Sequence, residues 1–81
     1  MSSVIVAFPK VENAKNIRNI LIKSGYDVPY ICTTGAQILQ SSHTLDGGII
    51  ICSHHFIDMM YQELYEYLPP EFQMLLVASP A

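Results

Sequence analysis

Three residues that could hold a metal ion lie close together in the sequence. Cys52 ends an apolar run, and His54 and His55 follow it in a polar stretch. Thiolates and imidazoles are ligands that Zn²⁺ accepts. The spacing argues against such a site, because adjacent histidine side chains usually point apart and His43, the remaining histidine, lies at the other end of a helix-loop segment. We therefore expect a polar loop here, with no bound metal and no other cofactor.

Cys52 also has a second interpretation, as the reactive thiol of a redox or small-molecule sensor. Open α/β sheets bind ligands in the crevice at the carboxyl ends of their strands, and Phe8, Cys52 and His54 would surround it. A reactive thiol needs nearby positive charge, which only the histidines could supply. The alternative is a small buried hydrophobic residue. Cys52 and Cys32 have no CxxC spacing and no secretory context, so we expect free thiols rather than a disulfide.

Other chemistry finds no support in the sequence. Gly47 and Gly48 precede an apolar run rather than a helix, so they offer no helix N-terminus to a phosphate group. No Ser-His-Asp set and no pair of catalytic carboxylates can be drawn from the chain. We therefore expect a protein that is not an enzyme.

The composition restricts the partners of the chain. Of its 81 residues, 51% are hydrophobic and only 14% are charged. All basic residues lie between positions 10 and 23, where they form either a docking face or the solvated face of a helix; they are Lys10, Lys15, Arg18 and Lys23. Without interleaved aromatic residues they do not indicate nucleic-acid binding. The sequence has neither a membrane-spanning run nor the layout of a signal peptide, so we expect a cytoplasmic protein without membrane contact.

Four apolar runs alternate with helical patterns over residues 1–81, which predicts one small α/β domain around a parallel sheet. The runs 4–8 and 49–52 are continuously apolar, as strands covered on both faces should be. The run 28–32 contains Pro29, which lacks a ladder donor and restricts its strand to a sheet edge. The last run, 74–78, reaches the end of the chain with nothing left to cover it.

Three helices are expected between these strands. The first begins after Pro9 and ends at Gly25, with an apolar stripe of Val11, Ala14, Ile17, Ile20 and Leu21. The second spans residues 35–44, because Thr34 and Gln37 have the spacing of a capping box. The third spans residues 59–68 and would be capped by Asp58. Its inward-facing residues would be Met60, Leu64, Tyr67 and Leu68.

This pattern resembles the receiver domain of response regulators, over about the first two thirds of that domain. The resemblance implies an open parallel sheet of flavodoxin-like order 2-1-3-4 with three helices, truncated after the fourth strand. Receivers hold Mg²⁺ and accept a phosphoryl group through carboxylates at the ends of strands 1 and 3. Phe8 and Pro9 match the family's acidic pair, Cys52 matches its phosphoacceptor and Ala78, beside Ser79, matches its hydroxyl position. The resemblance therefore implies a degenerate receiver that cannot be phosphorylated.

Four segments resemble, more closely, the N-terminal part of ANTAR-type antiterminator regulators: 4–10, 32–37, 45–49 and 74–79. In that family a receiver or pseudo-receiver precedes a coiled coil and a small RNA-binding domain. The resemblance implies a signalling module from a transcription antitermination regulator. RNA would be bound by the C-terminal domain, which this chain lacks, and not by these residues.

The last strand indicates how such a module would find a partner. A flat, uncharged edge strand is an aggregation hazard unless it is covered. We therefore expect a homodimer through Met74, Leu75, Leu76 and Val77, in which the strand pairs with its own copy about a two-fold axis or with a swapped element. Two tyrosines of the third helix, Tyr61 and Tyr65, are further interface candidates, or are ordinary packing residues with hydroxyls that reach water.

Overall fold

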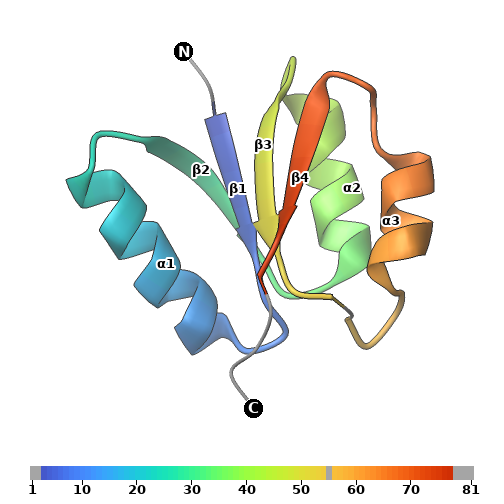
Figure 1. Ribbon diagram of the computed structural model, residues 1–81, viewed down its shortest axis with the longest axis horizontal. Helices are drawn as coiled ribbons and strands as arrows, with labels where there is room; N and C mark the ends of the chain where they lie inside the picture. Colours follow the sequence, from blue (N-terminus) through green and yellow to red (C-terminus); the bar gives the residue numbers. More distant parts are fainter. Residues whose placement is uncertain (1–2, 55, 78–81) are drawn as a thin grey trace.

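A computed structural model describes residues 3–54 and 56–77, in which four strands alternate with three helices. The strands are β1 (Ser3–Ala7), β2 (Asp27–Cys32), β3 (Gly48–Cys52) and β4 (Phe72–Leu76). The helices are α1 (Val11–Lys23), α2 (Gly35–Thr44) and α3 (Tyr61–Tyr67). All strands run parallel in one sheet of order β2-β1-β3-β4 (Figure 1). The predicted α/β class and flavodoxin-like strand order are confirmed.

The two inner strands carry the core of the sheet. Every residue of β1 from Val4 to Ala7 is buried, as its continuous apolar run predicts. β3 pairs with β1 in a regular register that aligns Val6 with Ile51 and Ala7 with Cys52. Gly48 opens β3 with φ +153, and a side-chain carbon on it would collide with the backbone oxygen of Ser3. Only glycine therefore allows β3 to start so close to β1.

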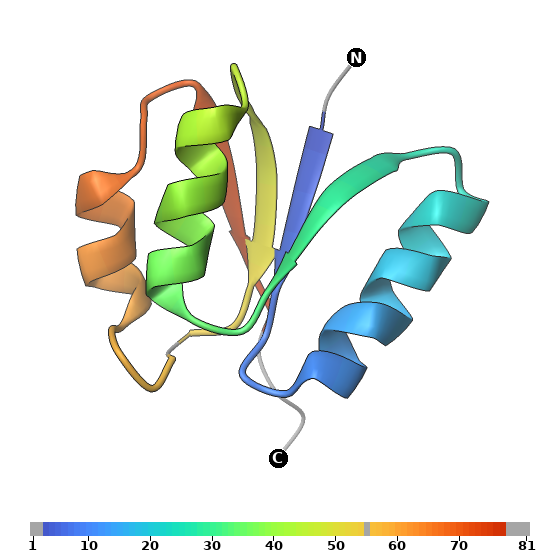
Figure 2. The ribbon, with the colours of Figure 1, turned by 180° about the vertical axis from the view of Figure 1, so that it is seen from behind.

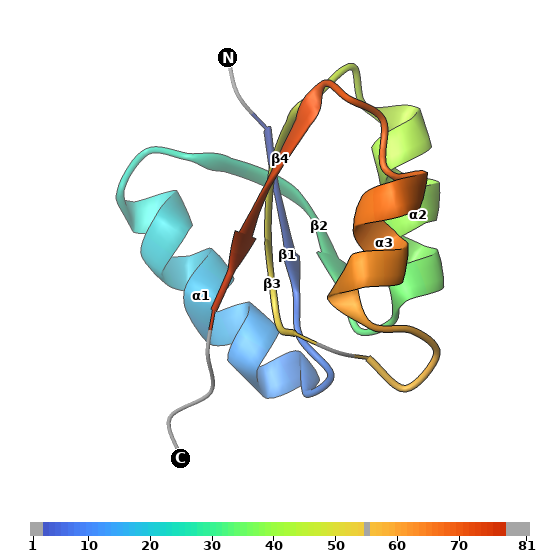
Figure 3. The same cartoon turned by 45° about the vertical axis from the view of Figure 1, so that its right-hand side comes forward.

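The helices cover the two faces of the sheet unequally. α1 lies alone on one face, and α2 and α3 lie together on the other (Figures 2 and 3). The core under α1 contains Val4, Val6, Phe8 and Ala14, and Ile17, Leu21, Val28, Ile31 and Ile51 pack around it. The core under α2 and α3 contains Ile5, Ala7, Cys32, Ile38, Ile50, Cys52, Phe56, Leu64 and Phe72. Alternate residues of each strand thus enter opposite cores, which is the period-2 geometry of a sheet covered on both faces.

α1 and α2 follow their sequence signals closely. α1 ends in a Schellman turn, in which Gly25 (φ 94) donates to Ile22 O at 3.0 Å and Tyr26 donates to Leu21 O at 3.0 Å. α2 has the predicted bounds, and the Thr34 hydroxyl accepts the Gln37 N–H at 3.2 Å. The other half of the expected capping box is displaced by one residue, because the Gln37 side chain accepts from the Thr33 N–H.

Some predicted core positions are wrong. Ile20 is 61% exposed and Val11 is also exposed, because α1 contacts the sheet only through the narrower stripe formed by Ala14, Ile17 and Leu21. α3 begins at Tyr61 rather than Met59 and has seven residues, so it has room for one fully buried side chain, Leu64. Met60 and Tyr67, expected inside, are 51% and 65% exposed.

None of the helices in the described residues is long and apolar enough to cross a membrane.

Candidate interaction surface at the open sheet edge

The carboxyl end of the sheet, where a receiver would hold its phosphorylation site, is filled by apolar side chains. Phe8 is buried in the core under α1, whereas Cys52 is buried in the core under α2 and α3. The backbone groups between them are already paired: Ser53 N–H donates to Ala7 O at 3.1 Å, and Phe8 N–H donates to Cys32 O at 3.1 Å. Pro9 is exposed and supplies no donor. These residues offer no oxygen ligands to a hard cation.

Phe8 and Cys52 do not surround one crevice. Cys52 lies opposite Ala7, the residue before Phe8, and successive residues of a strand point to opposite faces. Cys52 therefore enters the core under α2 and α3, and Phe8 enters the core under α1. Burial raises the pKa of the Cys52 thiol from 9.0 to about 11. Burial also raises the pKa of Cys32, and its hydrogen bond with the Ser41 hydroxyl at 3.6 Å offsets only part of that effect. Both cysteines are free, as predicted. At neutral pH they are protonated and poorly nucleophilic.

The residues considered as metal ligands do not form one cluster among the described residues. α2 runs antiparallel to the strands, so His43 near its end lies at the opposite end of the sheet from Cys52. The exposed His54 packs edge-on against the ring of Tyr61, with 5.7 Å between ring centroids. His55 lies outside the described residues. Among residues 3–54 and 56–77, no group of three or more His, Cys, Asp or Glu side chains could hold a metal ion.

Asp58 does not cap α3, which corrects the sequence-based expectation. Its carboxylate instead accepts the N–H groups of Gly35 and Ala36, both at 2.9 Å, at the start of α2. Desolvation raises the pKa of this carboxyl, but the N–H groups of Gly35, Ala36, Asp58 itself and Met59 lower it, and the net shift is downward. Met59 packs where a side chain on Gly35 would lie. The segment between β3 and α3 is therefore fastened to the N-terminus of α2.

β4 forms one edge of the sheet: it pairs with β3 on one side, and no described strand lies on its other side (Figure 3). Gly48 N–H donates to Glu71 O and Val77 N–H donates to Cys52 O, so the odd-numbered residues from 71 to 77 point their backbone groups at β3. Because the backbone of a strand alternates sides, Phe72, Met74 and Leu76 point theirs away from the sheet. No charged residue lies between Phe72 and Val77. This edge is therefore apolar and open to hydrogen bonding.

Apolar side chains flank the open edge on both faces. On the α1 face, Leu75 is 53% exposed and lies next to Ile51 in the register. α1 covers mainly β1 and β2, so no described helix lies over Leu75. Leu76 and Val77 are also exposed. The predicted interface residues of β4 are thus accessible, apart from Met74, which is partly buried against the core.

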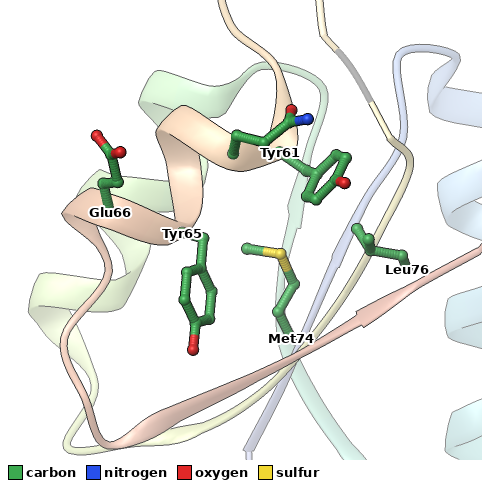
Figure 4. Close-up of a pocket in the computed structure, with 6 residues that line it drawn as sticks. Tyr61, Tyr65, Glu66, Met74 and Leu76 are labelled. Atoms are coloured by element: carbon green, nitrogen blue, oxygen red, sulfur yellow. The ribbon is translucent and has the colours of Figure 1, made fainter.

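On the other face a groove of about 450 Å³ runs between α3 and β4. Tyr61, Tyr65, Met74 and Leu76 direct their side chains into it, and the carboxylate of Glu66 points away from it (Figure 4). The groove brings the predicted tyrosine and β4 candidates together in one surface. The sequence suggested Tyr61, Tyr65 and the β4 residues separately, but it did not predict the groove, because the groove depends on how α3 lies against β4.

The basic residues lie elsewhere in the molecule. Lys15, Arg18 and Lys23 are on α1 and Lys10 directly precedes it, whereas Glu63, Glu66 and Glu71 lie on α3 or beside β4. The basic residues therefore lie on the α1 side of the sheet, together with Glu12, and the charged residues close to the open edge are acidic. The Arg18 Nε atom is buried without a hydrogen-bond partner.

Comparison of the chain with protein-family models, with curated proteins and with solved structures finds no match.

Proposed function

We propose that the protein is a non-catalytic interaction module that acts by self-association through the edge of β4. The observation that carries the proposal is this edge: an uncharged strand on which the outward backbone groups of Met74 and Leu76 have no described partner, flanked by exposed apolar side chains on both faces. Natural sheets usually block such an edge with charge, proline, a bulge or a covering element. Within the part of the chain that the structure describes, the outer side of β4 keeps none of these protections, and such an edge is suited to strand addition by a second chain.

The carboxyl end of the sheet supports a role without phosphoryl transfer. Phe8, Pro9 and Cys52 provide no carboxylate there, and the thiol of Cys52 is buried and protonated at neutral pH. A signal would then pass through binding alone, as in a pseudo-receiver. The sequence resemblance extends this proposal to the regulatory part of a cytoplasmic antitermination regulator, in which a separate domain would bind RNA.

Light scattering across a concentration series tests the proposal. We expect the wild-type mass to rise from one chain towards two. Leu75→Lys should weaken association at least roughly tenfold, because it removes an apolar contact and adds a charge to the edge. Ile20→Lys is the matched control: it places the same charge on a similarly exposed apolar residue of α1, far from β4, and should associate like the wild type.

A folded wild-type protein that stays monomeric at millimolar concentration would contradict self-association. An equal loss of association in both lysine variants would show that added charge, and not the β4 edge, governs the mass.

A further inference from the structure

We infer that two copies pair their β4 strands antiparallel about a two-fold axis that passes beside Leu75, with Met74 opposite the partner's Leu76. This inference rests on the proposed self-association and adds its geometry. A two-fold axis makes the same residues meet on both copies. Two copies of one strand edge can meet this way only when antiparallel, with the axis perpendicular to the sheet.

Hydrogen bonding limits the register. The outward groups available on each β4 are the N–H and C=O of Met74 and of Leu76, and the C=O of Phe72. The Phe72 N–H is already donated to Pro69 O at 3.2 Å. When Met74 lies opposite the partner's Leu76, the N–H of each residue donates to the C=O of the other. The two-fold axis repeats this pair of hydrogen bonds between Leu76 and the partner's Met74. Every available N–H and C=O of these two residues is then satisfied.

The neighbouring registers leave different groups unpaired. With Met74 opposite its own copy, Leu76 would face the partner's Phe72, whose N–H is occupied, so the Leu76 C=O would lack a donor while the Phe72 C=O would accept the partner's Leu76 N–H. This register forms as many hydrogen bonds between described residues as the axis beside Leu75, but it leaves Leu76 only half paired. With Leu76 opposite its own copy, the axis would lie at the last residue of β4, and the two strands would overlap over fewer residues. The axis beside Leu75 is the register that pairs both Met74 and Leu76 completely.

Side chains favour the same register. Leu75 would lie opposite the partner's Leu75 as a non-hydrogen-bonded pair, the closest kind of cross-strand neighbour. A perpendicular axis keeps each face of the sheet on the same side, so the apolar strip of half-buried Ile51 and exposed Leu75 would continue into its own copy. In the register centred on Met74, Leu75 would instead meet the partner's Gln73. Apolar surface is therefore best matched by the Leu75 axis.

Charge and area set the strength of this dimer. No charge lies between Phe72 and Val77, so two copies meet no like charges within the strand. The glutamates of α3 and Glu71 flank the edge on both copies and repel, so added salt should strengthen association. One short strand per copy supplies less than the roughly 800 Å² per partner of standard interfaces. The dimer should therefore be weak, and its test needs high protein concentration.

Disulfide trapping tests the register. Leu75→Cys would place two thiols on strands whose Cα atoms are about 4.5 Å apart, within the roughly 4.4–6.8 Å range of disulfides. Met74→Cys and Leu76→Cys are matched variants, each one residue from the axis, so that their copies would be roughly 8 Å apart and beyond disulfide reach. Wild-type protein is the background control, because Cys32 and Cys52 are buried. Each protein is oxidised under native conditions at a concentration where light scattering detects the dimer.

We expect Leu75→Cys to form a covalent dimer at least roughly tenfold faster than the other two variants and the wild type. Faster linkage through Met74→Cys or Leu76→Cys in a protein that does dimerise would overturn the register and leave the proposed function standing. Dimerisation without linkage at any of the three positions would place the interface away from β4 and overturn both. A wild-type protein that stays monomeric would overturn both the register and the proposed function. Of these outcomes, it is the one that shows the absence of self-association.

Discussion

The two edges of this sheet are built in opposite ways. β2 carries Asp27 and Pro29, and its register with β1 shifts between the positions opposite Ser3 and Ile5, beside the proline. Helices pack against it on both faces, α1 on one side and α2 on the other. β4 has no charge, no proline and a regular register with β3, and Leu75 on its α1 face is exposed.

The difference shows that an edge strand in this protein is protected by its own residues and by its neighbours together. Proline removes an outward donor and a bulge twists the edge away from an approaching strand, so β2 cannot act as a template for a second chain. β4 has none of these features and lies beside an apolar groove. Association is therefore expected only at the β4 edge. Because each chain has one such edge, assembly stops at two chains and does not extend into a fibre.

The largest expected effect is on the free energy of unfolding, and it distinguishes a residue needed for folding from one needed only for association. Ile50, fully buried in β3, and Leu75, on β4, are apolar residues of adjacent strands. Ile50→Ala should lower the free energy of unfolding by about 2–5 kcal/mol, because it leaves a cavity in the core. Leu75→Ala should change it by about 0.5 kcal/mol or less in the monomer, since the side chain is half exposed. Urea titration followed by circular dichroism at low concentration measures both values.

A cost above roughly 2 kcal/mol for Leu75→Ala under monomeric conditions would show that Leu75 is a folding residue and that β4 is not an open edge.

An intermediate effect is expected where the segment after β3 is fastened to α2. Asp58→Asn should destabilise the protein by about 1 kcal/mol at neutral pH, because it weakens the carboxylate that accepts the Gly35 and Ala36 N–H groups. The folded-state pKa of Asp58 is lowered, so its stabilisation is present above the unfolded value near pH 4 and is lost as pH falls through the folded value. The difference between wild type and variant should therefore shrink in acid. Thermal unfolding between pH 3 and pH 7 measures it.

Asp46→Asn is the control for that experiment, because it removes an exposed carboxylate from a loop at the other end of the sheet. An equal loss of stability in the two variants would point to net charge rather than to the start of α2.

The smallest effect is expected at the protected edge. Pro29→Ala restores a backbone N–H to β2 and should change the free energy of unfolding by roughly 1 kcal/mol or less. Asp27 and the packed helices remain, so the variant should still reach the mass of a dimer and no more. Light scattering at the highest concentration used for the wild type provides the measurement. Larger assemblies would show that Pro29 alone keeps β2 closed.

Much of the fold could be predicted from local sequence signals. The continuous apolar runs identify β1 and β3, Pro29 indicates the edge position of β2, and the spacing of Thr34 and Gln37 fixes the start of α2. Each of these signals acts through backbone geometry within a few residues. The burial of Cys52 could be predicted for the same reason, because it ends a run of buried strand residues.

Features that depend on distant contacts could not be predicted in this way. Asp58 has the position of an α3 cap in the sequence, yet it accepts N–H groups 23 and 22 residues away. Helical periodicity suggested that Met60 and Tyr67 face inward, but α3 starts later and is too short for both to reach the core. The α3–β4 groove depends on how far α3 lies from the sheet, which no spacing within α3 records.

By itself the sequence determined the order and type of the elements, the lack of a carboxylate at Phe8, Pro9 and Cys52, and the absence of charge in the last strand. The tertiary structure decided which apolar residues stay exposed: Leu75 and the groove residues around Met74 remain open, whereas Ile50 and Cys52 on the adjacent strand are sealed. The physical reason is that hydrophobic periodicity fixes the face on which a side chain lies. Whether that face is covered depends on the placement of helices, which is set by contacts between residues far apart in the chain.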